Sequence, residues 1–293
     1  MTGAVPGNPG APFRSGFVSL VGRPNVGKST LVNAMLRTKV SITSPSPNTT
    51  RTRVRGILEG DGYQAVLVDT PGIHKPKSAL GERLNETATS ALDDVDVCVL
   101  VVDATAAIGP GDRFVAAQLP SRSVVVVNKL DRASASQLLA QLARAAELLG
   151  LAEAEYYPVS ARTGEGVPEL LSHIVGRLPA GPRYYPEGTV RDVPEAFFLG
   201  ELVREQLLRV AREELPHSIA CRVTEWELPY VRCEILVERE SQKAIVVGRG
   251  GSVLKAVGIA ARRALPPGSY LDLVVKVERD WQRRPDVIER LGY

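Results

Sequence analysis

Short apolar runs alternate with longer amphipathic segments through the first part of the chain. The apolar runs are rich in Val and cover residues 17–21, 65–68, 95–102 and 124–127, and a further strand is expected at 156–159. Runs of this length and composition are typical of buried strands. The segments between them place Leu and Ala at helical spacing, as at residues 137–149. The alternation predicts an α/β domain in which helices cover both faces of a mostly parallel sheet.

The amino-acid composition of the chain changes after residue 178. Residues 178–194 contain four prolines and two glycines, a composition that supports neither a helix nor a central strand. We therefore predict a first domain at 13–178, a Pro-rich linker at 179–194 and a second domain at 195–293 that includes a C-terminal extension. Residues 1–12 have no charged start and no apolar stretch, so we expect a flexible tail and no secretory signal.

The second domain has the pattern of an α+β fold. An amphipathic helix is expected at 195–214, followed by strands at 218–226 and 230–238 with a break at Leu228 and Pro229. A short segment then leads to Val247 and a glycine cluster. A basic helix at 252–265 and a strand at 270–277 complete the pattern.

Composition narrows the class of protein. Of the 293 residues, 44% are hydrophobic and 24% are charged, which is typical of soluble globular proteins. The longest apolar stretch, residues 95–107, is interrupted by Asp96 and Asp103, so the pattern excludes an integral membrane protein. The three cysteines lack the spacing of zinc or redox sites and are expected to be buried thiols in a reducing cytoplasm.

Net charge alone says little, but its distribution is uneven. A formal charge of +3 is too small to indicate nucleic-acid binding. Residues 243–284, however, hold nine basic side chains against three acidic ones. The basic excess therefore lies around the glycine cluster and the helix that follows it.

The sequence GRPNVGKS at residues 22–29 matches the phosphate-loop pattern, and it lies between a predicted strand and a predicted helix. Its glycines let the backbone wrap a phosphate, the lysine neutralises β- and γ-phosphate charge, and the serine hydroxyl is a magnesium ligand. The predicted nucleotide-binding residues in this region are Gly22, Asn25, Val26, Gly27, Lys28, Ser29 and Thr30.

Two further motifs follow strands of the same sheet. Asp69, at the end of a strand, is expected to hold magnesium, and the amide of Gly72 to reach the γ-phosphate. Asp131 in the sequence NKLD is expected to accept hydrogen bonds from N1 and N2 of guanine, which adenine does not offer. Asn128 belongs to the same motif, Lys129 has a stem that can stack on the base, and Ser160 and Ala161 offer backbone amides to the guanine carbonyl.

The glycine cluster GRGG at residues 248–251 is a GXXG loop at the start of a basic helix. Such a loop lets a nucleic-acid backbone approach closely, whereas the plain alternative is a helix cap. Ile245, Val246 and Val257 could form an apolar wall for bases. The predicted RNA-binding residues are Gly248, Arg249, Gly250, Gly251, Ser252, Lys255 and Arg262.

Residues 17–293 resemble the Era-like GTPases. The resemblance rests on the motifs above, on the stretch Thr49-Thr50-Arg51 and on the closing residues 280–281 and 291–293. That family lies in the translation-factor-like class of P-loop GTPases and carries a C-terminal type II KH domain. The resemblance implies that GTP is hydrolysed to GDP and phosphate with Mg²⁺. It implies a metal site of Ser29, Thr50 and Asp69, and catalytic roles for Lys28, Thr50, Gly72 and Asn25, the last through a K⁺ ion.

The resemblance also implies a partner. A monomer in the cytoplasm, associated peripherally with the inner face of the cell membrane, would bind the 3′ end of small-subunit ribosomal RNA and assist assembly of the small ribosomal subunit. Two alternatives stay open: a scaffold whose hydrolysis is incidental, and another cytoplasmic GTPase, acting in tRNA modification or in signalling at the inner face of the cell membrane.

Three residues have two interpretations each. Ile73 stands where Ras-like GTPases place a water-orienting glutamine, and we expect it to pack in the switch region, so that hydrolysis needs other help. His74 is either a base or a solvated loop residue. Trp281 either stacks on RNA or anchors the C-terminal segment.

Overall fold

The computed structural model describes residues 12–74, 78–93, 95–210 and 218–293. The described residues form two compact units. The first contains those of 12–41, 50–74 and 84–192, and the second those of Ile42–Thr49, 78–83 and 193–293. The predicted N-terminal tail, apart from Pro12, lies outside the described residues.

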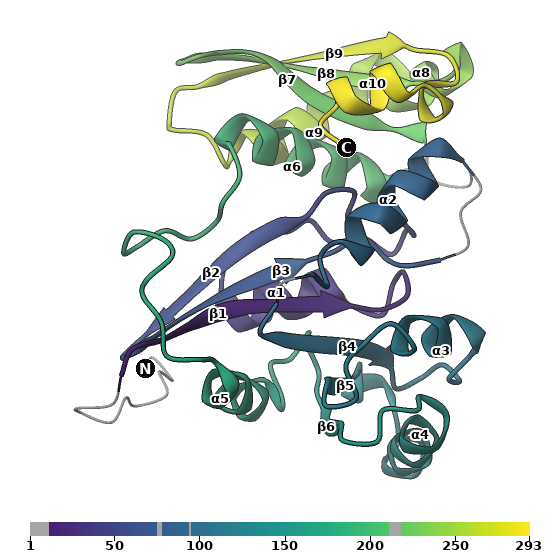
Figure 1. Ribbon diagram of the computed structural model, residues 1–293. Helices are drawn as coiled ribbons and strands as arrows, with labels where there is room; N and C mark the ends of the chain where they lie inside the picture. Colours follow the sequence, from purple (N-terminus) through teal and green to yellow (C-terminus); the bar gives the residue numbers. More distant parts are fainter. Residues whose placement is uncertain (1–11, 75–77, 94, 211–217) are drawn as a thin grey trace. The chain divides into compact units, whose positions relative to one another are not determined.

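The first unit is built on a six-stranded sheet with strand order β2-β3-β1-β4-β5-β6 (Figure 1). β2 is antiparallel to β3, and the other neighbours are parallel, which confirms the predicted mostly parallel sheet. The edge strand β2 was not predicted, because its sequence VRGILEG is half polar. The strands are β1 (Arg14–Val21), β2 (Val54–Gly60), β3 (Tyr63–Asp69), β4 (Val97–Asp103), β5 (Val124–Asn128) and β6 (Glu155–Pro158).

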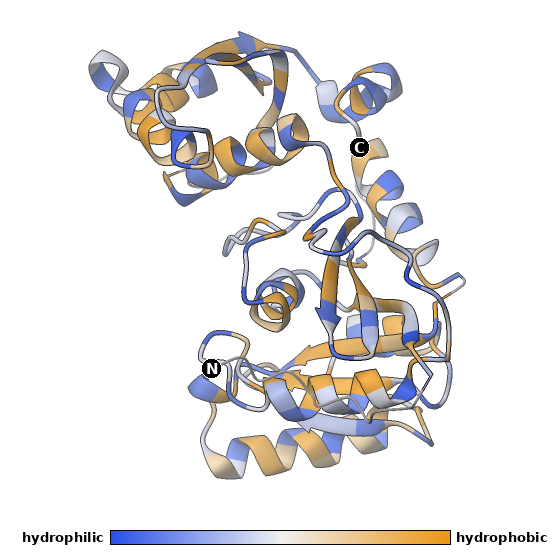
Figure 2. Ribbon diagram, turned by 90° about the vertical axis from the view of Figure 1, so that its left-hand side faces the viewer, coloured by the Kyte–Doolittle hydropathy of each residue, from blue (hydrophilic) through white to orange (hydrophobic). Residues whose placement is uncertain are grey.

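Helices cover both faces of this sheet. The side chains of Leu100, Val102, Val125 and Val127 alternate along β4 and β5 and form one core with α3 and α4. α1 and α5 pack against each other. Figure 2 shows the strands mainly in the hydrophobic colour, as expected when both faces are buried. The helices are α1 (Lys28–Leu36), α2 (Ala79–Thr89), α3 (Pro110–Ala116), α4 (Ala135–Leu148) and α5 (Val167–Arg177).

Most of the predicted linker is ordered along the edge of this sheet. Gln64 Oε1 accepts hydrogen bonds from the backbone N–H groups of Tyr184, at 2.8 Å, and Tyr185, at 3.0 Å. The N–H of Ile57 in β2 donates to the carbonyl of Val190 at 3.0 Å. Residues up to Asp192 therefore belong to the first unit.

The second unit has a three-stranded sheet of order β7-β8-β9, in which β7 and β8 are antiparallel and β8 and β9 are parallel. Helices pack on it through a core that includes Val203, Cys233, Val246 and Val257. Part of the predicted helix 195–214 lies outside the described residues. The elements are α6 (Glu195–Val210), β7 (Ala220–Glu227), β8 (Tyr230–Val237), α8 (Glu240–Val247), α9 (Ser252–Arg262), β9 (Tyr270–Val277) and α10 (Pro285–Arg290).

Helix α8 forms the short segment before the glycines, for which the sequence predicted neither a helix nor a strand. Gln242 Oε1 accepts hydrogen bonds from the N–H groups of Glu238, at 2.8 Å, and Arg239, at 3.1 Å. These bonds satisfy donors at the first turn, and Val246 is buried in the core. Eight residues with two such anchors form a helix that is too short to give a clear periodic signal.

Residues Glu240–Arg262, 23 in number, are long and apolar enough to cross a membrane, by length and composition alone. In the structure they form two helices, α8 and α9, because Gly250 between them has φ 59°. A spanning segment needs one unbroken set of helical hydrogen bonds. We therefore assign this stretch to the fold of the second unit.

Two predictions about individual side chains are settled by burial. Cys98, Cys221 and Cys233 are free buried thiols, as expected. Trp281 is buried, and its indole N–H donates to the carbonyl of Ser218 at 2.9 Å. Trp281 is therefore an anchor of the C-terminal segment and not a stacking surface for RNA.

Candidate nucleotide and RNA sites

The phosphate loop joins β1 to α1 in a conformation that depends on Gly27. Gly27 has φ 100°, and a Cβ there would lie 2.3 Å from Asn128 Nδ2. That nitrogen donates to the carbonyl of Val26 at 2.9 Å, while Asn128 Oδ1 accepts from the N–H of Ala161 at 3.0 Å. Asn128 therefore ties the phosphate loop to the loop that follows β6.

Lys28 is buried at the centre of the loop. Its Nζ donates to the carbonyls of Gly22, at 3.1 Å, and Arg23, at 3.0 Å. Burial lowers the pKa of Lys28 from 10.5 to about 8, and the nearby charge of Asp69 only partly opposes this. A cation that is costly to bury without an anion is a suitable partner for phosphate.

The three residues predicted to bind the metal lie together. Ser29 Oγ lies 2.8 Å from Thr50 Oγ1, and Thr50 Oγ1 donates to Asp69 Oδ2 at 3.3 Å. Asp69 is fully buried, and its Oδ1 has no hydrogen-bond partner among the described residues. Burial raises the pKa of Asp69, whereas the Ser29 hydroxyl and the Lys28 charge lower it. A buried carboxylate beside two hydroxyls fits a hard divalent cation such as Mg²⁺.

The base-recognition residues are oriented by neighbouring side chains. Asp131 Oδ1 accepts a hydrogen bond from Ser160 Oγ at 2.6 Å, and its Oδ2 lies 2.8 Å from Arg162 Nη2. The Ser160 bond and the Arg162 charge hold the pKa of Asp131 below its usual value, despite an opposing effect of burial. Asp131 is therefore an ionised acceptor at neutral pH, as recognition of guanine requires.

The backbone amides predicted to meet the guanine carbonyl have partners within the protein. The N–H of Ser160 donates to Glu165 O at 2.9 Å, and that of Ala161 is bonded to Asn128. Ser160 thus orients Asp131 through its hydroxyl, whereas the prediction assigned it a backbone role. The Ala161 amide can meet a base only if Asn128 shares or releases it.

Asp103 was missed by the sequence reasoning. Lys129 Nζ donates to Asp103 Oδ2 at 2.5 Å and to the carbonyl of Asn25 at 2.8 Å. Lys129, which follows β5, therefore connects the end of β4 to the phosphate loop. The signal was present, because Asp103 ends a parallel strand at the same sheet edge as Asp69 and Asn128.

The switch residues after Asp69 pack against the phosphate loop. Ile73 is buried in the sheet core, and its N–H donates to Gly22 O at 3.2 Å. The side chain of Ile73 packs as predicted, and because it is aliphatic it cannot form a hydrogen bond to a water molecule. His74 Nδ1 lies 3.2 Å from the carbonyl of Gly72, so its ring is held close to its own loop.

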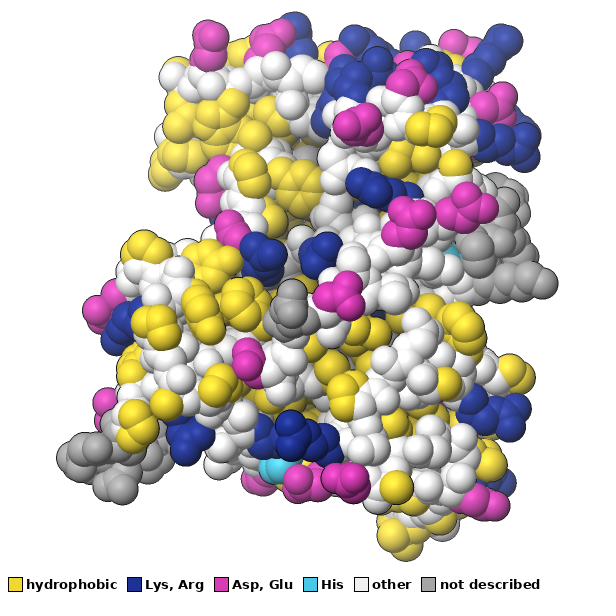
Figure 3. Space-filling model, in the orientation of Figure 1, with side chains coloured by type: hydrophobic (Ala, Val, Ile, Leu, Met, Phe, Trp, Pro, Cys, Tyr) yellow, Lys and Arg dark blue, Asp and Glu magenta, His cyan; other side chains and the backbone are white. Residues whose placement is uncertain are grey.

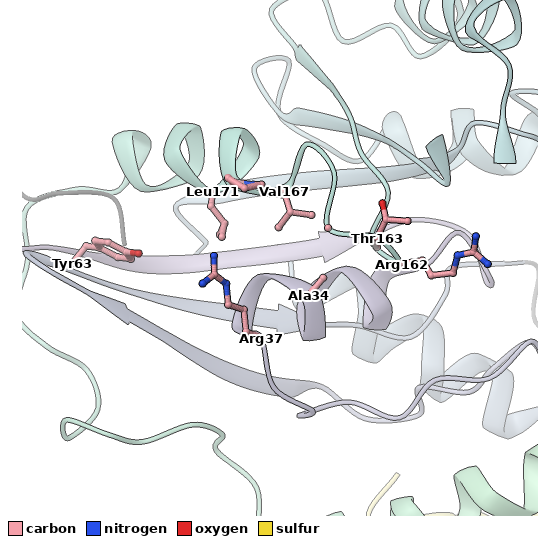
Figure 4. A pocket seen from close by; sticks show the side chains of 10 residues that line it. Ala34, Arg37, Tyr63, Arg162, Thr163, Val167 and Leu171 are labelled. Atoms are coloured by element: carbon pink, nitrogen blue, oxygen red, sulfur yellow. The ribbon is translucent and has the colours of Figure 1, made fainter. Parts of the chain in front are cut away.

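A cavity of about 340 Å³ lies between α1 and α5 and is distinct from the phosphate loop (Figure 4). It shares only Ala161 with the predicted nucleotide-binding residues. In Figure 4, Arg37 reaches towards α5 while Arg162 points away from the cavity. The lining residues are Ala34, Arg37, Tyr63, Ala161, Arg162, Thr163, Gly164, Val167, Pro168 and Leu171.

The GXXG loop connects α8 to α9 in the second unit. Gly248, Gly250 and Gly251 all have positive φ, and a Cβ on Gly248 would lie 2.5 Å from Val253 Cγ2. The side chains of Arg249, Ser252, Lys255 and Arg262 are exposed. The glycines of the loop therefore leave its backbone uncovered by side chains, next to a row of exposed polar and basic side chains.

The predicted apolar wall is wrong for two of its three residues. Val246 and Val257 are each only 2% exposed and lie in the core, because the helical period turns them towards the sheet. Ile245 is 56% exposed, and Ile259, which was not predicted, is 47% exposed. On the side of α10, the same unit carries a cluster of Lys and Arg side chains (Figure 3).

Comparison with known families defines the class of protein. Residues 17–129 match the family described as 50S ribosome-binding GTPase, and residues 214–282 match the KH domain. The chain is thus a P-loop GTPase that carries a C-terminal KH domain.

The chain belongs to the Era family of GTPases. It is 46% identical to GTPase Era of Mycobacterium sp. (strain JLS), over 96% of this chain and 99% of that protein. Identity to GTPase Era of Mycobacterium tuberculosis (strain ATCC 25177 / H37Ra) is 47%, with the same coverage. Like its family, the protein hydrolyses GTP to GDP and phosphate, as the sequence predicted.

Two solved structures share the whole fold. An Era crystal structure in complex with MgGDPNP and nucleotides 1506–1542 of 16S ribosomal RNA has a TM-score of 0.90 at 37% identity, covering 96% of this chain and 99% of that one. Aquifex aeolicus Era, in a variant form bound to GDP.AlF4⁻, has a TM-score of 0.89 at 37% identity, with the same coverage.

Proposed function

We propose that this GTPase is a switch that binds the 3′ region of small-subunit ribosomal RNA and assists assembly of the small ribosomal subunit in the cytoplasm. The observation that carries this proposal is the exposed GXXG loop with its basic helix, in the same chain as a complete set of GTPase loops. The Era relative solved with 16S ribosomal RNA supports it. A role without RNA is not favoured, because it leaves the KH domain without a ligand.

Within the first unit we assign roles to the residues predicted from sequence. Lys28 and the Gly72 amide would stabilise the transferring phosphoryl group, and Asn128, Lys129 and Asp131 would hold guanine. Ser29, Thr50 and Asp69 would hold Mg²⁺, which when bound neutralises charge between the β- and γ-phosphates. The proximity of the three side chains supports this assignment, as does Asp69 Oδ1, which has no hydrogen-bond partner among the described residues.

The division into domains at 13–178, 179–194 and 195–293 remains our proposal.

A monomeric state and an association with the inner face of the cell membrane also remain predictions. Analytical ultracentrifugation and co-sedimentation with anionic vesicles would test them.

We expect the double variant Arg249→Asp/Gly250→Asp to bind single-stranded RNA of the 16S 3′-end sequence at least about tenfold more weakly, because one positive charge is lost, two negative charges repel phosphates and side chains crowd the loop. The log-log salt slope of binding should fall in magnitude by about 0.7 for each phosphate that the protein no longer neutralises. Affinity for GTP should not change. The measurement is fluorescence anisotropy at several salt concentrations.

A matched control is available in the first unit. Arg144 is exposed, and Gly150, like Gly250, has a positive φ and open space around its Cβ position. Arg144→Asp/Gly150→Asp makes the same charge change and should retain RNA binding. Equal RNA affinity in the two double variants would contradict the proposal and reduce the GXXG loop to a helix cap.

We also propose that Asn25 helps to hold a K⁺ ion beside the transferring phosphoryl group. The positive charge of the ion would stabilise the charge that develops between the β- and γ-phosphates, as the side chain of an arginine does in other GTPases. Asn25 has φ 65°, and Lys129 bonds to its carbonyl, so its backbone is held in the phosphate loop. GTP turnover should be about tenfold faster in K⁺ than in Na⁺ at equal ionic strength, and Asn25→Ala should remove the difference. Equal rates in both salts for the parent protein would contradict this role.

A further inference from the structure

Side chains from other parts of the first unit hold the phosphate loop in place. The carbonyls of Asn25 and Val26 are bonded by the last residue of β5 and the residue after it. A further attachment lies at Arg23, whose Nε donates to Asp112 Oδ1 at 2.8 Å. Asp112 belongs to the first turn of α3, a helix outside the GTPase motifs. The phosphate loop is therefore also anchored to an element that no nucleotide motif marks.

The carboxylate of Asp112 is buried, with a relative exposure of 1%, whereas the Arg23 side chain is 34% exposed. Asp112 Oδ2 accepts a hydrogen bond from the N–H of Gly109 at 2.9 Å, which satisfies a donor at the start of α3. That function needs only one oxygen. Burying the second oxygen is unfavourable unless a donor meets it, and the Arg23 guanidinium supplies that donor.

Gly111, the residue before Asp112, leaves space for the same arginine. A Cβ on Gly111 would lie 2.7 Å from Arg23 Cδ. Gly111 lies inside α3 and its φ is not positive, so its backbone conformation does not require glycine. Alanine would be the better helix former at this position. Two consecutive residues of α3 are therefore fitted to Arg23, one by its charge and one by the absence of a side chain.

The backbone of residues 23 and 24 lies against two groups assigned to the transferring phosphoryl group. Lys28 Nζ donates to the carbonyl of Arg23 at 3.0 Å. Gly72 lies so close to the next residue that a Cβ there would be 2.5 Å from Pro24 N. The position of Arg23 and Pro24 therefore helps to set where the Lys28 ammonium group and the Gly72 amide lie.

We propose that Asp112 is a positioning residue for GTP hydrolysis: by holding the Arg23 side chain in the space beside Gly111, it keeps the phosphate loop where the Lys28 ammonium group and the Gly72 amide meet the transferring phosphoryl group. The inference rests on the proposed roles of Lys28 and Gly72. It adds α3 to the elements that shape the nucleotide site.

The first variant is Gly111→Ala in the full chain, because its methyl group displaces the Arg23 side chain without removing any charge. We expect kcat at saturating GTP to fall about tenfold, the usual effect of losing a charge-assisted hydrogen bond. Affinity for GDP should stay within about threefold, since GDP lacks the γ-phosphate. A role limited to folding would instead leave kcat per folded molecule unchanged or weaken GDP binding to the same extent.

The second variant is Asp112→Asn, which is similar in shape. Its amide oxygen can still accept from the Gly109 N–H, whereas the negative charge facing Arg23 is lost. It should lower kcat by about tenfold as well. Because both substitutions act through one ion pair, Gly111→Ala/Asp112→Asn should be no slower than the slower single variant. Additive losses, about 100-fold together, would contradict a shared role.

A matched control is Gly176→Ala, the same substitution inside α5 of the same unit, where a Cβ would have nothing within 4 Å. It should leave kcat and GDP affinity unchanged. The parent's kcat in a folded Gly111→Ala or Asp112→Asn protein would overturn the proposal. Lys28→Met separates the two levels of inference: if it leaves kcat unchanged, the role of Lys28 itself fails, and if it alone lowers kcat, only the role of Asp112 fails.

Discussion

Lys28→Met should weaken GTP binding at least about 100-fold while making the nucleotide-free protein more stable at pH 7, by roughly 3 kcal/mol. The affinity falls because the side chain that neutralises the phosphates is absent. Stability rises because the folded protein holds a buried lysine whose pKa is about 8 instead of 10.5. Methionine fills a similar volume without a charge to desolvate.

The pH dependence follows from the direction of this shift. Between pH 8 and 10.5 the unfolded chain binds more protons at Lys28 than the folded chain, so the stability of the parent protein rises with pH across this range. The advantage of Lys28→Met is therefore full below pH 8 and gone above pH 10.5. Urea unfolding from pH 7 to 10 and calorimetric titration with GTP measure the two effects.

Lys243→Met, at a partly exposed position in the second unit, is the control and should change stability by no more than about 0.5 kcal/mol. A less stable Lys28→Met protein at pH 7 would show that burying the ammonium group in the phosphate loop does not destabilise the nucleotide-free protein. Unchanged affinity for GTP would remove Lys28 from the nucleotide site.

Asp131→Asn should lower affinity for GTP by about 1000-fold, roughly 4 kcal/mol. The amide nitrogen of asparagine places a donor opposite the donors on N1 and N2 of guanine. Xanthosine triphosphate has a carbonyl where guanine has its amine, so it should bind this variant better than GTP does. Competition between the two triphosphates for a fluorescent nucleotide measures the change in preference.

Two further variants make this test sharper. Ser160→Ala removes the 2.6 Å hydrogen bond that orients Asp131, so it should weaken GTP and GDP equally, by about tenfold, without creating a preference for xanthine. Asp61→Asn, the same substitution in the exposed turn between β2 and β3, should have no effect. Retention of the parent's preference for GTP in Asp131→Asn would show that another residue reads the base.

The nucleotide motifs could be predicted because they depend on local chemistry at fixed places in the fold. Parallel strands end at one edge of a sheet, so Asp69 and Asn128 had to lie close together once their strands were recognised. The same rule applied to Asp103, but a lone aspartate has no motif to mark its role.

The errors have a common physical cause. Val246 and Val257 are apolar residues on helices that are exposed on one side and buried on the other. Their neighbours Ile245 and Ile259 have the same chemistry, and only the packing direction of α8 and α9 separates core from surface. For Trp281 the sequence left two interpretations open, because the acceptor of its N–H, Ser218, is distant in sequence.

The sequence by itself determined the α/β and α+β units, the family, the chemistry of the phosphate loop and the preference for guanine, since each is encoded in residues that are contiguous or regularly spaced. Only the tertiary structure decided that Ser160 orients Asp131 through its hydroxyl and that Asp103 holds Lys129. These are interactions between residues 29 and 26 positions apart in the chain. Partners at such separations are chosen by how helices and strands pack, which no local pattern of residues records.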